Sequence, residues 1–219
     1  WKMVLVFALV LSGCEQKQAT RENESLKTEQ TLSLNIPLRC PTNETCWTVN
    51  TYPDNEPGPG LQDFNCGKKV QDNSFDTRFR LNSDIRYQSI VFVVAPAAGE
   101  VVARREGMDE SLYEKYGKEA VEGKECGNGV MISHAEGVKS QVCHLKTGSV
   151  KPNVGDHVEK GQLLGVVGQS GWASEPFLSF VVRYNGEKID PFVGKGKMSK
   201  YGLGKQHLWS EHALLEFGF

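Results

Sequence analysis

Short apolar runs, many of them rich in valine, alternate with glycine, proline and polar residues along most of the chain. Apolar residues at every second position predict strands near 130–133, 138–144 and 177–184, because alternate side chains of a strand point to opposite faces. The turn HAEG at 134–137 joins the first two strands into a hairpin. The segment GDHVEKGQLLGVVGQSG at 155–171 has the turns of tightly connected antiparallel strands. The pattern predicts a mostly β fold.

One stretch has the spacing of a helix: MDESLYEKYGKEAVEG, residues 108–123. Asp109 is a candidate N-cap, and Leu112, Tyr116 and Ala120 follow in steps of four along one face. We interpret this stretch as a short helical insertion that packs on the strands. By contrast, His134 and His157 fall in turns, so we expect both side chains to be exposed.

The first residues have the pattern of an export signal. Lys2 precedes an unbroken apolar run from Met3 to Leu11, and a Ser-Gly-Cys sequence ending at Cys14 follows. A bilayer span takes about 20 apolar residues, so this shorter run resembles a lipoprotein signal that is cut before Cys14, whose sulfur then carries the lipid. A buried strand is the alternative, but core strands rarely continue into a segment as polar as EQKQATRENESLKTEQ. Because the chain starts at Trp1 without an initiator Met, we expect a few residues upstream.

These features divide the chain into four parts. Residues 1–13 are the predicted signal peptide, and 14–36 are the lipidated cysteine and a polar tether that cannot bury enough surface to fold. Residues 37–194 form the predicted domain, and 195–219 a C-terminal extension. The expected location is the bacterial cell envelope, facing the periplasm, with the lipid as membrane anchor. The net charge of -2 and the lack of a glycine-rich phosphate loop argue against nucleic acid as a partner.

Five cysteines follow Cys14, and export permits disulfides. Cys40 and Cys46 flank the turn-rich loop PTNET. Cys126 and Cys143 flank the predicted hairpin, whose fold brings them within about two residues of register, near the Cα separation of about 5.5 Å that a disulfide needs. We predict a disulfide in both pairs. Cys66 then remains, either free or paired with a cysteine of another chain.

From Gly127 onward, the motifs GNGVMISHAEG, CHL, GDHVEKGQLLGVVGQSG and FLSFVVRYNGEKIDPF resemble, in order and spacing, the lysostaphin-type (LytM-like) peptidoglycan endopeptidases. The resemblance extends back through TRFRL and covers roughly three quarters of the chain. It implies an antiparallel β-sheet or sandwich with one short helical insertion. A biotinyl or lipoyl carrier domain is a weaker alternative, because no lysine lies in the hairpin-tip context that such a domain modifies.

The resemblance implies one catalytic zinc, held by a His-x-x-x-Asp pair and the second histidine of a later His-x-His. Anchoring on TRFRL places Ser74 and Arg78 at the first two zinc positions, and EPFLSF places Phe177 and Ser179 at the His-x-His. His144, in CHL, is the one family catalytic position that is kept. Because a hydroxyl is a poor zinc ligand and a guanidinium repels the ion, we expect no zinc and no other cofactor.

A shifted zinc site is the alternative. Asp72 and Asp76 keep the same spacing two residues earlier, which preserves the face of a strand, so that with His144 they could hold zinc. Otherwise the two aspartates belong to a solvated turn, and His144 is a retained groove residue.

Three functions follow as hypotheses. The first is a catalytically inactive domain that binds peptidoglycan stem peptides or a cell-wall hydrolase through its groove, with Arg78 contacting a carboxylate and Phe177 forming an apolar floor. The second is a zinc endopeptidase that cleaves peptidoglycan cross-links through the shifted site. The third is a regulatory partner, such as an activator of an amidase.

Overall fold

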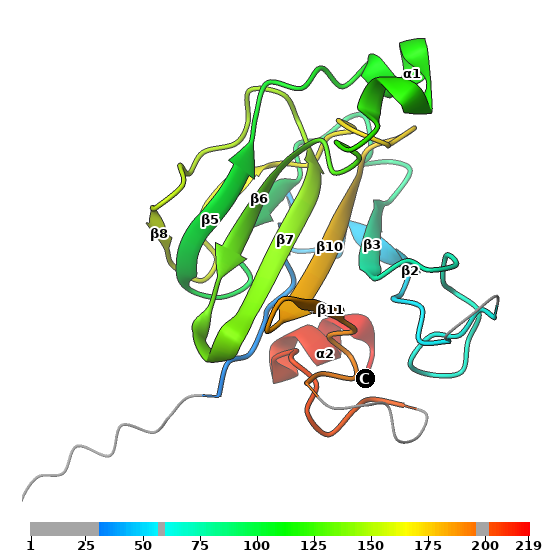
Figure 1. The fold of residues 1–219 in the computed structure, drawn as a ribbon, viewed down its shortest axis with the longest axis vertical. Coiled ribbons are helices and arrows are strands. Elements are labelled where there is room, and N and C mark those ends of the chain that lie inside the picture. The colour runs from blue at the N-terminus through cyan, green and yellow to red at the C-terminus, as the bar shows by residue number, and fades with distance from the viewer. Residues whose placement is uncertain (1–30, 57–59, 196–201) are drawn as a thin grey trace, which may run out of the picture. The chain divides into compact units, whose positions relative to one another are not determined.

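A large antiparallel sheet dominates the computed structural model, which describes residues 31–56, 60–195 and 202–219. Eight strands belong to this sheet, seven of them in the order β2-β3-β10-β7-β6-β5-β8 with β11 paired to β10, and a smaller sheet has the order β1-β4-β9 (Figure 1). The strands are β1 (Leu38–Arg39), β2 (Trp47–Thr51), β3 (Asp76–Leu81), β4 (Phe92–Val94), β5 (Gly99–Arg105), β6 (Asn128–Ser133), β7 (Val138–Leu145), β8 (His157–Val158), β9 (Leu163–Val166), β10 (Phe177–Tyr184) and β11 (Glu187–Ile189). The helices are α1 (Leu112–Tyr116) and α2 (Glu211–Phe217), and short 3-10 turns lie at Lys118–Val121 and Ala135–Gly137. The predicted antiparallel β fold is confirmed.

Strand β10 shows how the sequence pattern forms the sheet. Leu178, Phe180 and Val182 are fully buried and face the core, whereas the residues between them face the opposite side. The strand pairs with β3 on one side and β7 on the other, both antiparallel. This position in the sheet explains why nearly every residue of β10 is at least half-buried.

The hairpin of β6 and β7 carries one of the two disulfides found in the described residues. Cys126 and Cys143 are bonded, with 4.8 Å between their Cα atoms, and Cys40 and Cys46 are bonded across a loop, with 5.6 Å between theirs. Cys66 is free and exposed among the described residues. Both predicted pairs and the predicted hairpin are therefore confirmed.

The helical insertion differs from its prediction. Helix α1 ends after Tyr116, because Gly117 adopts a left-handed φ of 78°. Tyr116 is 68% exposed and Ala120 lies in the following 3-10 turn, so the predicted apolar face is wrong. The fully buried residue of this segment is instead Val121.

Two further expectations need correction. His134 is buried, with Nδ1 2.8 Å from the carbonyl oxygen of Ala98 and Nε2 2.7 Å from the hydroxyl of Ser140. Both ring nitrogens of His134 thus have partners inside the fold, whereas His157 is exposed as expected. Helix α2, which the sequence pattern did not predict, begins at the N-cap Ser210, whose hydroxyl accepts from the backbone N–H of Ala213.

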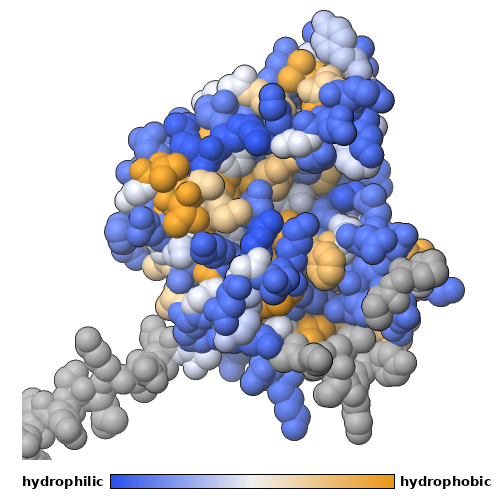
Figure 2. Space-filling model, in the orientation of Figure 1, coloured by the Kyte–Doolittle hydropathy of each residue, from blue (hydrophilic) through white to orange (hydrophobic). Residues whose placement is uncertain are grey.

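The described part of 195–219 belongs to the same compact unit, Leu32–Phe219, as the rest of the domain. Within the described residues no helix is both long and apolar enough to cross a bilayer. The face shown in Figure 2 is mostly hydrophilic, with apolar residues in small groups. The predicted signal peptide, Cys14 and most of the tether lie outside the described residues.

Candidate functional site

A groove of about 780 Å³ lies on one face of the large sheet and is lined by residues of β3, β10 and β7. These three strands are neighbours in the sheet (Figure 1). The groove contains all the positions that the family resemblance singled out, and the lining side chains include Asp72, Ser74, Phe75, Asp76, Arg78, Tyr113, Gln141, Cys143, His144, Trp172, Phe177, Ser179, Arg183 and Lys188. The strand register explains this convergence, because Ser179 of β10 pairs with Arg78 of β3 on one side and with Cys143 of β7 on the other.

Asp76 lies at the centre of a hydrogen-bond network in this groove. Ser74 donates its hydroxyl hydrogen to one carboxylate oxygen, and Arg78 donates from Nε to the other at 3.1 Å. The side chain of Ser179, on the neighbouring strand, also favours the ionised carboxylate. The aspartate is buried, with 7% of its surface exposed. Its placement in a solvated turn, one of the two sequence interpretations, is therefore wrong.

The network keeps Asp76 ionised. Burial alone raises the pKa of this carboxyl group, but the positive charge of Arg78 and the hydrogen bonds from Ser74, Ser179 and Arg78 outweigh it, so that the pKa is lowered from 3.8. A buried anion is thus stabilised by two observed donors, Ser74 and Arg78, and by a polar side chain of the adjacent strand β10.

The ring of Phe177 contacts both Arg78 and His144. The guanidinium carbon of Arg78 lies 5.1 Å from the centre of the Phe177 ring, a cation–π geometry, and the imidazole of His144 lies 4.5 Å from the same centre. The side chain of Arg78 is 27% exposed, so its outer part faces the groove.

His144 is held in an unusual backbone conformation. Its φ is 67°, in the left-handed region that non-glycine residues rarely adopt, next to a register shift in the β6–β7 ladder. Because this conformation breaks the alternation of the strand, Cys143 and His144 both reach the groove. The backbone N–H of His144 donates to the carbonyl oxygen of Cys126 at 2.8 Å, and its carbonyl oxygen accepts from Gly168 at 2.9 Å.

The tautomer of His144 follows from the hydrogen bond that its ring makes to Ser170. Nδ1 lies 2.8 Å from the carbonyl oxygen of Ser170, which can only accept, so Nδ1 carries the hydrogen. Burial lowers the pKa of His144 from 6.5 to about 4, although Ser170 and Asp76 oppose the shift. At neutral pH the ring is therefore uncharged, and Nε2 carries a free lone pair.

Gly127 allows the loop with Ser170 to approach. A Cβ atom at Gly127 would lie 2.3 Å from the carbonyl carbon of Ser170, and its φ of 63° also favours glycine. The close contact holds the acceptor of His144 in place.

Zinc, which the resemblance implies, does not fit these residues. Two hydroxyl groups and a guanidinium replace the three ligands. Ser74 and Arg78 donate hydrogen bonds to Asp76, and Ser179 also favours the ionised carboxylate. Among the described residues, no three His, Cys, Asp or Glu side chains form a group that could hold a metal ion. The shifted set does not form one either, because Asp72 is exposed and bonded to Asn73, while Asp76 is surrounded by donors. The absence of other cofactors stays a prediction.

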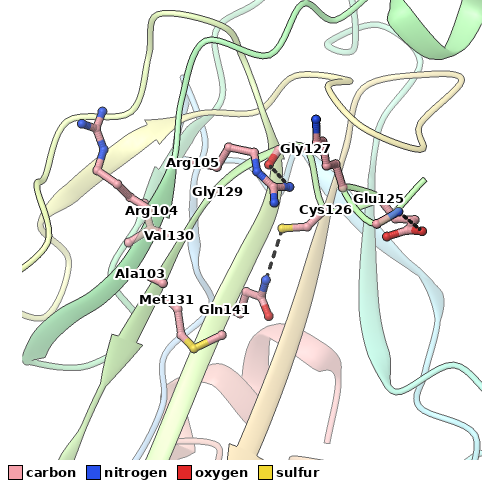
Figure 3. Close-up of a pocket in the computed structure, with 12 residues that line it drawn as sticks. Ala103, Arg104, Arg105, Glu125, Cys126, Gly127, Gly129, Val130, Met131 and Gln141 are labelled. Carbon is pink, nitrogen blue, oxygen red and sulfur yellow. Dashed lines mark hydrogen bonds between the residues drawn. The ribbon is translucent and has the colours of Figure 1, made fainter. Parts of the chain in front are cut away.

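A second hollow of about 270 Å³ adjoins the groove and shares Glu125, Cys126 and Gln141 with it (Figure 3). The amide nitrogen of Gln141 donates to Sγ of Cys126 at 3.3 Å, and Nη1 of Arg105 lies 3.4 Å from the carbonyl oxygen of Gly127. The disulfide therefore lies at the boundary between the two hollows.

Sequence reasoning missed several groove residues. Arg183 could have been found, because it shares the strand parity of Phe177 and Ser179 in β10, and its guanidinium donates to the Gln141 side chain at 2.9 Å. Trp172 and Tyr113 come from a loop and from α1, so no periodicity indicates them. The role of Asp76 as the shared partner was also missed, since it depends on the pairing of β3 with β10.

Residues 81–191, half of the chain, match the model of Peptidase family M23. The chain belongs to peptidase family M23. The M23 match contains His144, Phe177 and Ser179 but begins at Leu81, so Ser74 and Arg78 precede it.

Curated relatives match over shorter segments. The DD-carboxypeptidase/endopeptidase Mpg of Neisseria meningitidis serogroup B is 37% identical over 65 residues, which are 30% of this chain and 14% of that protein. The cell division protein DipM of Caulobacter vibrioides is 40% identical over 58 residues, 26% of this chain and 9% of that protein. The matched segments thus span only a small part of either relative.

Solved structures give weaker likenesses. The catalytic domain of the prophage-encoded M23 protein EnpA from Enterococcus faecalis has 19% identity and a TM-score of 0.47, over 71% of this chain and 97% of that one. A chain of the SpoIIIAH and SpoIIQ complex has 18% identity and a TM-score of 0.49, over 73% and 97%. Values this low carry no information on function.

Proposed function

We propose that this M23 protein binds peptidoglycan stem peptides in its groove and does not hydrolyse them with a family-type zinc ion. The observation that carries the proposal is the network around Asp76. The residues at the three zinc positions direct donors, not lone pairs, into the site. The neutral His144 has no metal-bound water to act on, so it can serve as a hydrogen-bond acceptor but has no nucleophile to activate.

The shape and lining of the groove support peptide binding. Apolar and aromatic side chains such as Phe177, Tyr113 and Trp172 alternate with the polar groups of Arg78 and His144. Small-molecule and peptide sites combine apolar walls with a few placed polar groups in this way. The names of the matched relatives, an endopeptidase and a cell division protein, are consistent with a ligand in the cell wall.

Anchoring in the cell envelope is a further part of the proposal. It is supported by the apolar run before Cys14 and by the polar segment after it. If Cys14 carries the lipid, metabolic labelling with a fatty acid should mark the protein, and Cys14→Ser should abolish both the label and membrane sedimentation. Labelling that survives in the Cys14→Ser variant would contradict this assignment.

Binding to the wall can be tested by sedimenting the full-length protein, solubilised in detergent, with purified peptidoglycan sacculi. We expect retention that soluble muropeptides compete away. Arg78→Ala should weaken retention at least about tenfold, the effect of losing one charged hydrogen-bonding group. Arg80→Ala is the matched control, because Arg80 lies on the same strand but pairs with Glu175 outside the groove.

Two results would contradict the proposal. If the unmodified protein sediments no more with sacculi than without them, the wall is not its ligand. Alternatively, metal analysis of the purified protein could find stoichiometric zinc together with release of muropeptides, and the protein would then be a working hydrolase. A pull-down with soluble envelope proteins separates wall binding from the hydrolase-partner and amidase-activator hypotheses.

A further inference from the structure

The residues at the three lost zinc positions share one partner. Ser74 and Arg78 donate hydrogen bonds to the carboxylate of Asp76, and the side chain of Ser179 also favours its charged form. A zinc site directs lone pairs toward a cation, whereas this site directs hydrogens toward an anion. The polarity of the site is therefore reversed, and a side chain of the protein itself supplies the central charge.

Arg78 is held in position by its neighbours, but part of its guanidinium group has no hydrogen-bond partner among the described residues. Nε donates a hydrogen bond to Asp76, and the guanidinium carbon lies 5.1 Å from the centre of the Phe177 ring, so two contacts hold its position. Among the described residues, neither Nη nitrogen has a hydrogen-bond partner, and Arg78 lines the groove. The planar guanidinium thus offers further donors to a ligand.

His144 offers the complementary group. Its Nδ1 hydrogen is used by Ser170, and Nε2 has no protein partner among the described residues. Nε2 is not fully buried, and His144 lines the groove, so a ligand in the groove can contact this nitrogen. Donor and acceptor lie against the same ring, that of Phe177.

We propose that this reversed site recognises a neutral carboxamide, whose carbonyl oxygen accepts from Arg78 and whose N–H donates to Nε2 of His144. Asp76 is the positioning residue, because it holds the guanidinium. A carboxylate fits less well, since it has no hydrogen for Nε2 and would place a second anion beside the Asp76–Arg78 pair. This inference rests on the proposed function, because it names the chemical group of a peptide ligand that the groove recognises.

Propionamide and propionate are suitable probes, because they have the same size and differ only in the group in question. The full-length protein is titrated with each, and binding is followed through the NMR signals of the His144 imidazole. We expect propionamide to bind at least about tenfold more tightly, the effect of one satisfied against one unsatisfied polar group. The ratio of the two dissociation constants is the informative quantity, because a general loss of structure would weaken both probes alike.

Variants test the role of Asp76. In Arg78→Lys, which keeps the charge but loses the planar donors, the preference for propionamide should fall to about one, and Asp76→Asn should have the same effect. Arg80→Lys is the control and should keep the preference. If Asp76→Asn does not fold, Arg78→Lys still decides the result.

Equal or tighter binding of propionate, or no response of His144 to either probe, would overturn the inference. Retention on sacculi in the same preparation would then leave the proposed function standing. Conversely, a clear preference for propionamide without retention on sacculi would support the carboxamide site and overturn the wall as its ligand.

Discussion

Burial and neighbouring charges set the protonation of the two central groove residues. The imidazole of His144 is buried, which lowers its pKa to about 4, so it is neutral at physiological pH. Asp76 is just as buried but is surrounded by donors, and its pKa is lowered, so it stays charged. Two buried residues in one groove therefore differ in charge because their hydrogen-bond partners differ.

Replacing Asp76 by Asn should destabilise the fold by about 1–3 kcal/mol at pH 7, because the donors around it lose their anion. The pKa of Asp76 lies below its ordinary value of 3.8, so its contribution is present above pH 3.8 and is lost as the pH falls through the lower, folded pKa. The difference between Asp76→Asn and wild type in urea unfolding should therefore shrink below pH 3.8. Asp72→Asn, at an exposed position, is the control, and an equally large effect there would contradict the assignment.

The hairpin of β6 and β7 connects the groove to the disulfide. Cys126 bonds to Cys143, and its carbonyl oxygen also accepts from the backbone of His144, the next residue along β7. The loop before β6 is thus tied to β7 by a covalent bond and a hydrogen bond at adjacent residues. The left-handed conformation of His144 is held by these neighbours, since the residue itself does not favour it.

Removal of the Cys126–Cys143 bond, as a double alanine variant, should lower the unfolding free energy by about 3 kcal/mol, because the bond closes the longer loop in the unfolded chain. Removal of Cys40–Cys46, with a sequence separation of 6 against 17, should cost about 2 kcal/mol. Urea unfolding of the two variants gives the comparison. A larger loss for the shorter loop would show that loop closure does not determine the difference.

Segments from both ends of the described chain close the core. Leu34 and Trp209 form a parallel bridge, with the backbone N–H of Leu34 donating to Leu208 and that of Ser210 donating to Leu34. The ring of Trp209 contacts three phenylalanines, Phe180 of β10, Phe192 and Phe217 of α2. The C-terminal segment is therefore part of the core that supports the inner face of β10.

Trp209→Ala should destabilise the domain by about 3–5 kcal/mol, the range for deleting a large buried aromatic side chain. Trp209 is 2% exposed, whereas Leu215 of the same region is 72% exposed, so Leu215→Ala should have little effect. Thermal and urea unfolding of both variants measure the contrast. Should Trp209→Ala cost less than about 1 kcal/mol, the C-terminal segment would contribute little to the core.

Much of the fold could be predicted because its signals are local. The strand at 177–184 and the hairpin around 134–137 follow from alternation and from one turn, and both are found where expected. Helix α1 was overestimated, because spacing by four suggested a continuous helix although Gly117 ends it. Helix α2 was missed because its seven residues are too few for a clear period.

The sequence by itself determined the family, the antiparallel strands, both disulfides and the identity of the residues at the zinc positions. Each of these depends on residue type and on spacing along the chain. Only the tertiary structure decided that Ser74 and Arg78 of one strand region and Ser179 of another share the carboxylate of Asp76, and that His144 is neutral with Nε2 free. These properties arise from strand pairing and burial, which bring distant residues together and exclude water, and neither is encoded in local spacing.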